Sequence, residues 1–432
     1  MPKAWRLLTL RGHLFVLVGL AIVLIGMAAG QRDVMRIGLL LLALPVVAAV
    51  LVARARLRMS CERSVQPAQV PLGSPMRGRI VLGQDGRLPA GILLLEDAVP
   101  AELGSRPRFV VDKADLSWRR EIDYPLLGRV RGRFHTGPLL VRTTDPFGLV
   151  RLDRRFVATT EVMVTPQVYP LPTMRGAGGA GSAGEARPHR IGVVGQDDVL
   201  VREYRQGDDV RRIHWRSTAR LGELMVRREE QAWDPSATIV LDSRASAHAG
   251  AGMGNSIEWA ISAAASVAIH FLDDGFSVEI YEADGSLHIS GQFGQHSSAS
   301  REVVINRLTD LRPRAATSLH YAVESATVDQ PSQLVVAVMG RMTPDDANVL
   351  LRARRNRAHG LAMVLDVDTF AEPDPDPAGR VPDSAPHAAL RRRQHELARE
   401  ILRENQWRVV EATRQTGVAE AWSTLEQLGH AA

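Results

Sequence analysis

Residues 12–31 read GHLFVLVGLAIVLIGMAAGQ and residues 37–53 read IGLLLLALPVVAAVLVA, with no formally charged side chain in either run. Each run is long enough to cross a hydrocarbon core of about 30 Å as a helix that rises ~1.5 Å per residue. In lipid the backbone must satisfy its own hydrogen bonds, so the sequence predicts a transmembrane helical hairpin with spans at about residues 13–30 and 37–53. Pro45 would kink the second helix without preventing it.

Basic residues are concentrated on one side of this predicted hairpin. Those that precede the first run are Lys3, Arg6 and Arg11, and those that follow the second are Arg54, Arg56, Arg58 and Arg63. Because positive charge stays inside, we expect a protein of the inner cell membrane with both termini, and most of the chain, in the cytoplasm. The alternative is a cleaved secretory signal that ends near residues 27–30, but a signal peptide needs no second apolar run.

Composition excludes several classes of protein. The chain has 432 residues, 45% of them hydrophobic and 23% charged, which is typical of two or three globular domains and not of a disordered or coiled-coil protein. Its 53 basic and 48 acidic residues give a net charge of +5, too small to indicate nucleic acid as a partner. The single cysteine, Cys61, excludes a disulfide framework within the chain and fits a reducing compartment.

Short β-rich pieces separated by proline and glycine fill residues 57–172, and they predict an antiparallel β-sandwich domain. The expected strands are residues 77–82, 91–95, 109–111, 117–124, 138–142 and 161–165. Two motifs stand out, RGRFHTGP at residues 131–138 and DPFGL at residues 145–149. The second predicts a tight turn in which Asp145 accepts hydrogen bonds from backbone N–H groups while Phe147 packs beneath it. We favour a structural turn there over a binding site.

A Gly/Ala/Ser-rich linker is expected at residues 173–190. Its GAGGAG at residues 176–181 matches the dinucleotide fingerprint in form only, because no strand precedes it and no helix follows. Beyond it, strands and helices alternate in residues 191–430, which predicts an α/β domain with a mostly parallel, doubly wound sheet. The expected strands are residues 238–241, 277–281, 334–338, 361–366 and 407–411, and the expected helices are 256–272, 301–311, one after 317, 345–359, 388–404 and 419–428.

The most distinctive segment is DDVLVREYRQGDDVRRIHWRSTARLGELMVRREE, residues 197–230. A helix capped by Asp208 or Asp209 would place Arg212, Arg216 and Arg220 on one face, and residues 223–229 look like a strand. Two interpretations of these charges remain open. The arginines could pair with acidic residues of the same segment in an internal salt-bridge network. Alternatively, they form a basic stripe that receives an acidic partner surface or a phosphate.

This segment resembles the signature of the domain-of-unknown-function family fifty-eight. The residues that carry the resemblance are Arg202, Glu203, Tyr204, Gly207, Asp208, Asp209, Arg212, Trp215, Arg216, Ser217 and Arg220. The hairpin and the two motifs of the β-rich region also look like that family. The resemblance implies a von Willebrand factor A-like α/β domain behind a β-sandwich. It further implies a MoxR-type AAA+ ATPase as partner, with the signature residues as the partner-binding set.

Von Willebrand A domains hold a divalent ion with an Asp-x-Ser-x-Ser loop, a distant Thr and a distant Asp, and oxygen ligands of this kind suit Mg²⁺. Here the loop reads Asp242-Ser243-Arg244-Ala245-Ser246, so the resemblance points to Asp242, Ser246 and Thr317, or Ser318 beside it. Arginine at the middle ligand position places a fixed positive charge where the cation would lie. The second acidic position falls on Met339-Gly340, which offers no carboxylate. We therefore expect no cofactor, with Mg²⁺ at a degenerate site as the alternative and Arg244 in the ion's place.

Motifs for catalysis are missing from the sequence. With lysine only at Lys3 and Lys113 there is no phosphate-binding P-loop, and the nucleophile elbow and the zinc-binding His-Glu-x-x-His are absent. Cys61 and His214 have no neighbours that indicate an activated group. We therefore predict a non-catalytic adaptor at the membrane. The alternative is a hydrolase or transferase with a site at the strand ends near Asp242 and the signature arginines; a structural partner of the cell-wall machinery is a third option.

Overall fold

The computed structural model describes residues 8–56, 59–85, 92–111, 117–145, 147–173, 201–204, 213–227, 236–283, 289–291, 297–316, 318–328, 334–354, 359–371 and 385–428. The chain forms two compact units. The first comprises Met1–Gln167 with Leu308–Asp310, and the second comprises Val168–Arg307 with Leu311–Ala432.

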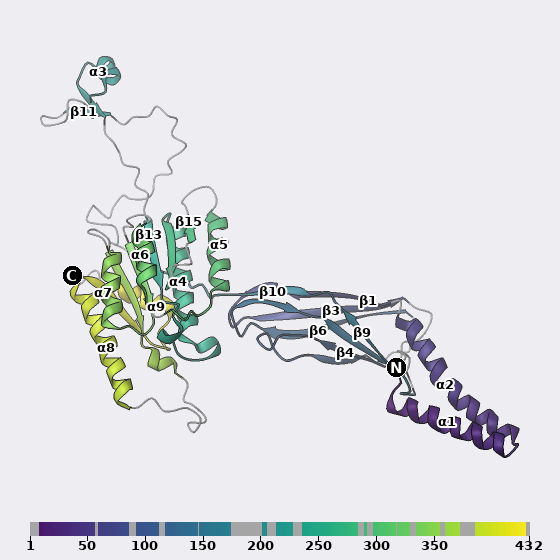
Figure 1. Cartoon of the computed structure of the whole chain (residues 1–432). Coiled ribbons are helices and arrows are strands. Elements are labelled where there is room, and N and C mark those ends of the chain that lie inside the picture. The colour runs from purple at the N-terminus through teal and green to yellow at the C-terminus, as the bar shows by residue number, and fades with distance from the viewer. Residues whose placement is uncertain are drawn as a thin grey trace. The chain divides into compact units, whose positions relative to one another are not determined.

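Two long apolar helices begin the first unit, α1 (Leu10–Ala28) and α2 (Arg32–Arg56) (Figure 1). Both are long and apolar enough to cross a membrane, and only 17% of each apolar window is buried. The two predicted helices are therefore present, and they are compatible with membrane anchoring. Helix α2 begins five residues before the predicted span and continues through Pro45.

Small residues allow α1 and α2 to lie close together. The buried residues of α1 are Gly12, Gly19 and Gly26, which recur every seventh position and therefore share one face. A Cβ built on Gly19 would lie 3.1 Å from the carbonyl oxygen of Gly38 in α2, and one on Gly26 would lie 2.8 Å from the backbone nitrogen of Met35. Any larger side chain on this face would push the helices apart.

The β-rich part of the first unit holds ten strands within the described residues. They are β1 (Met59–Gln66), β2 (Gln69–Pro71), β3 (Pro75–Asp85), β4 (Ile92–Asp97), β5 (Arg108–Val111), β6 (Ser117–Leu127), β7 (Gly132–Thr136), β8 (Leu139–Thr144), β9 (Arg151–Phe156) and β10 (Thr160–Thr165). They form three sheets, in the orders β1-β3-β6, β2-β10-β7 and β5-β4-β8-β9. Every pairing is antiparallel except β2 with β10. Alternate residues of all three sheets, such as Leu82, Leu95 and Val164, meet in one hydrophobic core.

The DPFGL turn connects β8 to β9. The carboxylate of Asp145, 3% exposed, accepts hydrogen bonds from the backbone N–H groups of Phe147 (3.0 Å) and Val150 (2.6 Å), as predicted. The prediction that Phe147 packs beneath the turn was wrong, because Phe147 is 64% exposed. Leu149, 1% exposed, takes the buried position instead, since its backbone is bonded to the start of α1: Thr9 N donates to Leu149 O at 2.9 Å.

The second unit is built on a six-stranded sheet in the order β15-β14-β13-β16-β17-β18. All pairings are parallel except that of β15, so the prediction of a mostly parallel sheet is confirmed. The strands are β13 (Ser236–Leu241), β14 (Ser277–Glu282), β15 (Ile289–Gly291), β16 (Leu334–Met339), β17 (His359–Leu365) and β18 (Trp407–Ala412). The helices are α4 (Ser256–Asp273), α5 (Ser297–Asp310), α6 (His320–Val328), α7 (Pro344–Ala353), α8 (Ala385–Glu404) and α9 (Val418–Gln427).

Helices pack on this sheet through alternate strand residues. Val335, Ala337 and Met339 of β16 share a core with α6, α7 and α8. The residues between them point to the other face of the sheet. There α4 contacts β13, β14 and β16. It also packs against α9, where the rings of Phe271 and Trp422 meet edge-on with their centroids 5.7 Å apart. The chain travels outward from β13 to β14 and then returns to β16 on the other side, so β13 and β16 mark the switch point of the sheet.

Candidate functional site

The candidate site lies at the carboxyl ends of β13 and β16, where sheets of this kind bind ligands. Asp242 follows directly after β13, and its backbone N–H donates to the carbonyl oxygen of Val338 in β16 at 2.9 Å. This bond continues the parallel ladder one residue past the strand. It fixes the Asp242 carboxylate at the sheet edge, fully buried.

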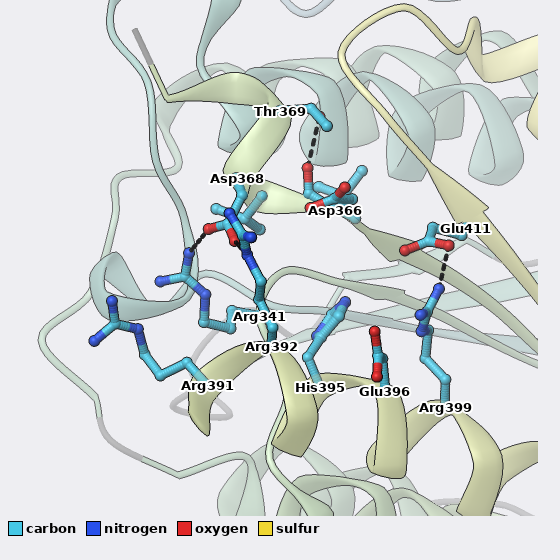
Figure 2. A pocket seen from close by; sticks show the side chains of 12 residues that line it. Arg341, Asp366, Asp368, Thr369, Arg391, Arg392, His395, Glu396, Arg399 and Glu411 are labelled. Carbon is cyan, nitrogen blue, oxygen red and sulfur yellow. Dashed lines mark hydrogen bonds and ion pairs between the residues drawn. The ribbon is translucent and has the colours of Figure 1, made fainter. Parts of the chain in front are cut away.

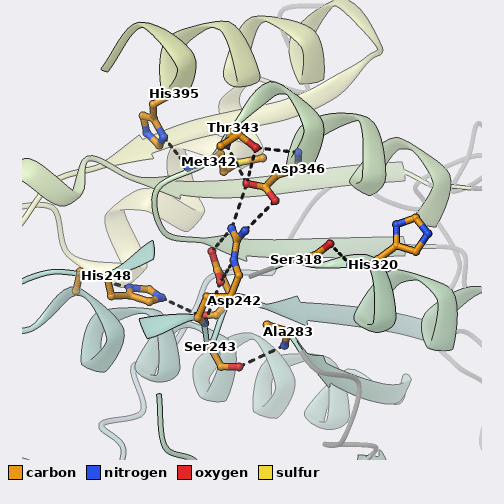
Figure 3. A network of polar contacts seen from close by, with 12 residues as sticks. Asp242, Ser243, His248, Ala283, Ser318, His320, Met342, Thr343, Asp346 and His395 are labelled. Carbon is orange, nitrogen blue, oxygen red and sulfur yellow. Dashed lines mark hydrogen bonds and ion pairs between the residues drawn. The ribbon is translucent and has the colours of Figure 1, made fainter. Parts of the chain in front are cut away.

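Arg244 lies in front of that carboxylate and binds it. Figure 3 labels Asp242 and the nearby Asp346. Arg244 Nε and Nη2 donate to the two oxygens of Asp242, each at 2.9 Å. Its Nη1 and Nη2 donate to the two oxygens of a second carboxylate, that of Asp346, at 2.8 and 3.2 Å. One guanidinium is therefore forked onto two acids at once, the geometry that makes arginine a strong and specific partner.

The second acid comes from the first turn of α7. Thr343 caps this helix, and Asp346 completes a capping box: Thr343 N and Thr343 Oγ1 donate to Asp346 Oδ2 at 2.9 and 3.0 Å. The N-terminus of a helix also favours a negative charge. Sequence reasoning missed Asp346, although the Thr-x-x-Asp spacing before a helix is a recognisable signal of this local geometry.

Gly340 explains why the acid comes from α7. It follows β16, at the position where the resemblance expects the second carboxylate. A Cβ there would clash with the carbonyl oxygen of Ala247, and that same oxygen accepts a hydrogen bond from Arg341 N at 2.8 Å. No side chain fits at this point of the loop, so Asp346 supplies the carboxylate from seven residues after Met339.

Burial shapes the electrostatics of this cluster. Arg244 is 5% exposed and Asp346 is 6% exposed. Burial by itself lowers the pKa of Arg244, but the hydrogen bonds and negative charges of Asp242 and Asp346 outweigh it and raise that pKa above its ordinary value. The arginine is thus a permanent cation inside the protein.

His248 holds the loop that follows β13 in place through two contacts. Its Nε2 lies 2.7 Å from the carbonyl oxygen of Asp242, so Nε2 carries the proton, and its Nδ1 lies 2.9 Å from Ser256 Oγ at the start of α4. Burial lowers the pKa of His248. A neutral histidine therefore ties the Asp242 backbone to α4.

The arrangement does not fit a divalent ion. Both carboxylates already bind Arg244, and a cation in the same place would meet its charge at close range. Ser246 is exposed, and Thr317 lies outside the described residues. Ser318, beside it, accepts a hydrogen bond from His320 N at 3.1 Å. Among the described residues no group of three or more His, Cys, Asp or Glu side chains could hold a metal ion.

The signature segment folds locally into two short strands and a helix, β11 (Val201–Glu203), α3 (Trp215–Leu221) and β12 (Met225–Arg227). Arg202 and Glu203 lie in β11, which pairs antiparallel with β12, and Tyr204 N donates to Leu224 O at 2.8 Å. Gly207, Asp208, Asp209 and Arg212 lie outside the described residues.

Helix α3 begins later than predicted, and its cap is His214 rather than Asp208 or Asp209. The His214 ring accepts from Ser217 N at 3.3 Å and contacts Ser217 Oγ at 2.8 Å. The backbone before it is extended, because Ile213 bridges to Val226 of β12. This pairing keeps Ile213 itself out of a helical conformation, and α3 starts at Trp215.

No residue of α3 is buried. Trp215 is 68% exposed and Leu221 is 62% exposed, and both Arg216 and Arg220 are exposed one turn apart. Neither arginine forms an ion pair with an acidic residue of the described ranges. The internal salt-bridge network therefore remains a prediction, and the helix presents an aromatic ring and two cations to its surroundings.

A pocket of about 380 Å³ opens at the carboxyl ends of β17 and β18 (Figure 2). Asp368 joins two arginines there, Arg341 at 2.5 Å and Arg392 at 2.7 Å, and Arg399 pairs with Glu411. His395, 9% exposed, accepts a hydrogen bond from Met342 N at 3.0 Å, and burial together with Arg399 lowers its pKa to about 4. Sequence reasoning missed these residues, because their pairing depends on how α8 lies beside the sheet.

The comparisons with known proteins bear on the signature and the sheet. Residues 200–375 match the sequence model of the family described as "Protein of unknown function DUF58". The chain carries a DUF58 domain. The match begins at β11 and ends after β17, so the signature segment, Asp242, Arg244 and Asp346 all belong to the DUF58 domain, whereas α8 and its part of the pocket lie beyond the matched residues.

No curated protein matches the chain. Among solved structures, one similar chain is the Pseudomonas fluorescens alkylpurine DNA glycosylase AlkC bound to DNA containing an abasic site analog. The identity is 14%, the TM-score is 0.17, and the match covers 31% of this chain and only 39% of the glycosylase chain. At that TM-score the likeness supports no statement about the DUF58 domain.

Proposed function

We propose that this chain is a non-catalytic adaptor, held at the inner membrane by α1 and α2, that docks a MoxR-type AAA+ ATPase on the cytoplasmic side. The observation that carries the proposal is the place of Arg244. It fills the switch point of the sheet, where α/β domains bind their ligands, and it engages both carboxylates there. Because Arg244 fills the place where a substrate or cofactor would bind, we favour a role in binding other proteins over a role in catalysis.

The signature segment is the proposed docking surface. Trp215, Arg216 and Arg220 stand exposed on α3, and tryptophan and arginine are the residue types that most often dominate protein–protein binding energy. Their charge suits an acidic patch on the partner. The choice of a MoxR-type ATPase, the von Willebrand A-like character of the sheet domain and the sandwich arrangement of the β-rich part rest on the family resemblance.

Orientation in the membrane follows from the flanking charges. The basic residues before α1 and after α2 favour a hairpin with both ends inside the cell. This topology places both units on the side where an AAA+ ATPase has its nucleotide. Nucleic acid plays no part in the proposal, because the net charge of +5 is small for a chain of this length.

Co-purification from native membranes in detergent tests the proposal. The ATPase should be recovered with the full-length chain, and Arg216→Glu should reduce the recovery roughly tenfold by removing one cation of the docking surface. Arg403→Glu, which changes the same charge at an exposed position of α8, should leave recovery unchanged. Equal recovery with Arg216→Glu and the unmodified chain, or no ATPase in either sample, would count against the proposal.

A further inference from the structure

The DPFGL turn is attached to the membrane helices rather than only to its own sheet. Leu8, two residues before α1, forms an antiparallel bridge with Val150. Thr9 N donates to Leu149 O at 2.9 Å, and Thr9 Oγ1 donates to Gly148 O at 2.5 Å. Three consecutive residues of the turn are therefore bonded to the chain that enters the first apolar helix.

Side-chain packing places the turn within the apolar part of both helices. Leu149 and Val150 share a hydrophobic cluster with Ala48, and Phe15 and Leu44 pack against it. Phe15 and Ala48 lie inside the apolar windows Leu10–Ala28 and Arg32–Val52. Ala48 stands four residues before the end of its window, which corresponds to about 6 Å along a helix axis.

Gly12 makes this approach possible. It is buried on α1, and a Cβ at this position would clash with the carbonyl oxygen of Leu149. The backbone of the turn thus touches the backbone of the first apolar helix directly. Because residues of the apolar windows surround Leu149, the turn sits at the depth where those windows begin and end, and not above them.

This arrangement leaves the side chain of Phe147 exposed. It is 64% exposed, and the Asp145 carboxylate holds its backbone N–H at 3.0 Å. Two exposed residues beside the turn are basic: Arg11 lies close to Gly148, and Arg151, which also pairs with Asp153 at 3.7 Å, is exposed at the start of β9. Phenylalanine is among the apolar residues that proteins bury at the boundary between headgroups and acyl chains, and arginines attract anionic headgroups there.

We propose that the part of the turn from Phe147 to Val150 inserts into the interfacial layer of the bilayer, with the Phe147 ring among the phospholipids. It would be a third membrane contact besides α1 and α2. The inference rests on the proposed membrane anchoring. Lipid contact would account for the exposure of Phe147, which the geometry of the turn alone does not explain. The inserted turn would also hold the β-rich part of the first unit against the membrane surface.

Spin labels on the full-length chain in lipid nanodiscs test this inference. The discs contain phosphatidylcholine and anionic phosphatidylglycerol, and Cys61→Ser removes the single native cysteine. One label is placed with Phe147→Cys. Leu17→Cys, 63% exposed in the middle of α1, is the lipid control, and Val157→Cys, 80% exposed past the far end of β9, is the water control. Six β-residues separate Val157 from the turn by about 20 Å.

Power saturation then compares access to oxygen, which enriches in lipid, with access to a water-soluble nickel chelate. The labels at positions 147 and 17 should both favour oxygen, and the label at position 157 should favour nickel. A label at 147 that behaves like the one at 157, while the label at 17 stays in lipid, overturns the inference alone. Nickel access at both 147 and 17 overturns the membrane anchoring as well. The three labelled side chains are exposed, so their replacement leaves the core intact.

Discussion

At the scale of single residues, Arg244 determines the character of the sheet edge. Its guanidinium is the cation that both Asp242 and Asp346 bind, and all three residues are buried. Two carboxylates facing one another without that cation would repel at short range. The arginine therefore has to be present for the loop after β13 and the start of α7 to keep their places.

Arg244→Met tests this role, since methionine fills similar volume without charge. Removal of one partner from a buried ion pair costs about 3–5 kcal/mol of unfolding free energy, which corresponds to roughly 10 °C in the unfolding midpoint of the second unit. Thermal unfolding of the full-length chain in detergent, followed by circular dichroism, measures the shift. Arg216→Met, at an exposed position, is the matched control and should change the midpoint little. An unchanged midpoint in Arg244→Met would contradict the ion-pair role.

His395 makes stability depend on pH. In the folded chain its pKa is about 4, against an ordinary value near 6.5, because burial and Arg399 disfavour the charged ring. The unfolded chain therefore binds more protons between these two values, and the folded state loses stability as pH falls from about 6.5 towards 4. The loss from His395 amounts to about 3 kcal/mol at most. Arg341, Asp368 and Glu411 also lie near the ring and act on its pKa through their charges.

His395→Asn, which can still accept from Met342 N, isolates that contribution. We expect the difference in unfolding midpoint between pH 7 and pH 5 to be smaller in His395→Asn than in the unmodified chain. His359→Asn is the control, because this histidine is exposed and does not line the pocket that holds His395. Parallel pH profiles of His395→Asn and the unmodified chain would show that another group accounts for the acid sensitivity.

Residue patterns in the sequence predict part of the candidate site, and the remaining part depends on tertiary packing. The sequence places Asp242 and Arg244 two positions apart, so a guanidinium beside the carboxylate could be predicted. Asp346 lies 102 residues beyond Arg244, and only the packing of α7 on the sheet brings the two together. The error at Phe147 has a different cause: the rule that large apolar side chains turn inward assumes water outside, and this turn lies against the apolar helices.

At the scale of elements, α1 and α2 depend on their glycine face. Gly19→Leu should weaken the hairpin, because a side chain there meets Gly38 O and the side chains of Leu41 and Leu42 at distances near 3.1 Å. Overpacking of this kind costs typically 1–3 kcal/mol. Titration of the detergent-solubilised chain with sodium dodecyl sulfate, followed by helical signal, measures the effect. Val18→Leu, on the exposed side of α1, should behave like the unmodified chain; equal losses in both variants would argue against close packing through glycine.

Most strands and helices of the second unit could be predicted from their hydrophobic pattern. The short strands β11 and β15 were not predicted, and the other errors occur at the ends of elements. Helix α7 was predicted to reach residue 359 but ends at Ala353. Arg354 leaves the helical conformation, and its guanidinium donates to Asn405 O at 2.5 Å and Gln406 Oε1 at 3.4 Å. A contact with the end of α8, distant in sequence, thus overrides local helical propensity. The same cause, strand pairing at Ile213, delays the start of α3.

At the scale of the whole molecule, the chain divides into parts with different features. Two apolar helices are compatible with membrane anchoring, the β-rich part carries the turn that lies against them, and the DUF58 match covers the signature segment and most of the sheet. We propose that this sheet edge is not a cation or substrate site, because Arg244 occupies the switch point, and that the DUF58 domain binds other polypeptides through its signature segment instead.

Thermal unfolding of the full-length chain in detergent with increasing MgCl₂, and with EDTA as the reference, tests that claim most directly. We predict that the midpoint of the second unit is the same in Mg²⁺ and in EDTA, both for the unmodified chain and, at its own lower midpoint, for Asp242→Ala. A rise of the midpoint with Mg²⁺ in the unmodified chain that Asp242→Ala abolishes would contradict the claim, because it would place a cation where the structure places Arg244.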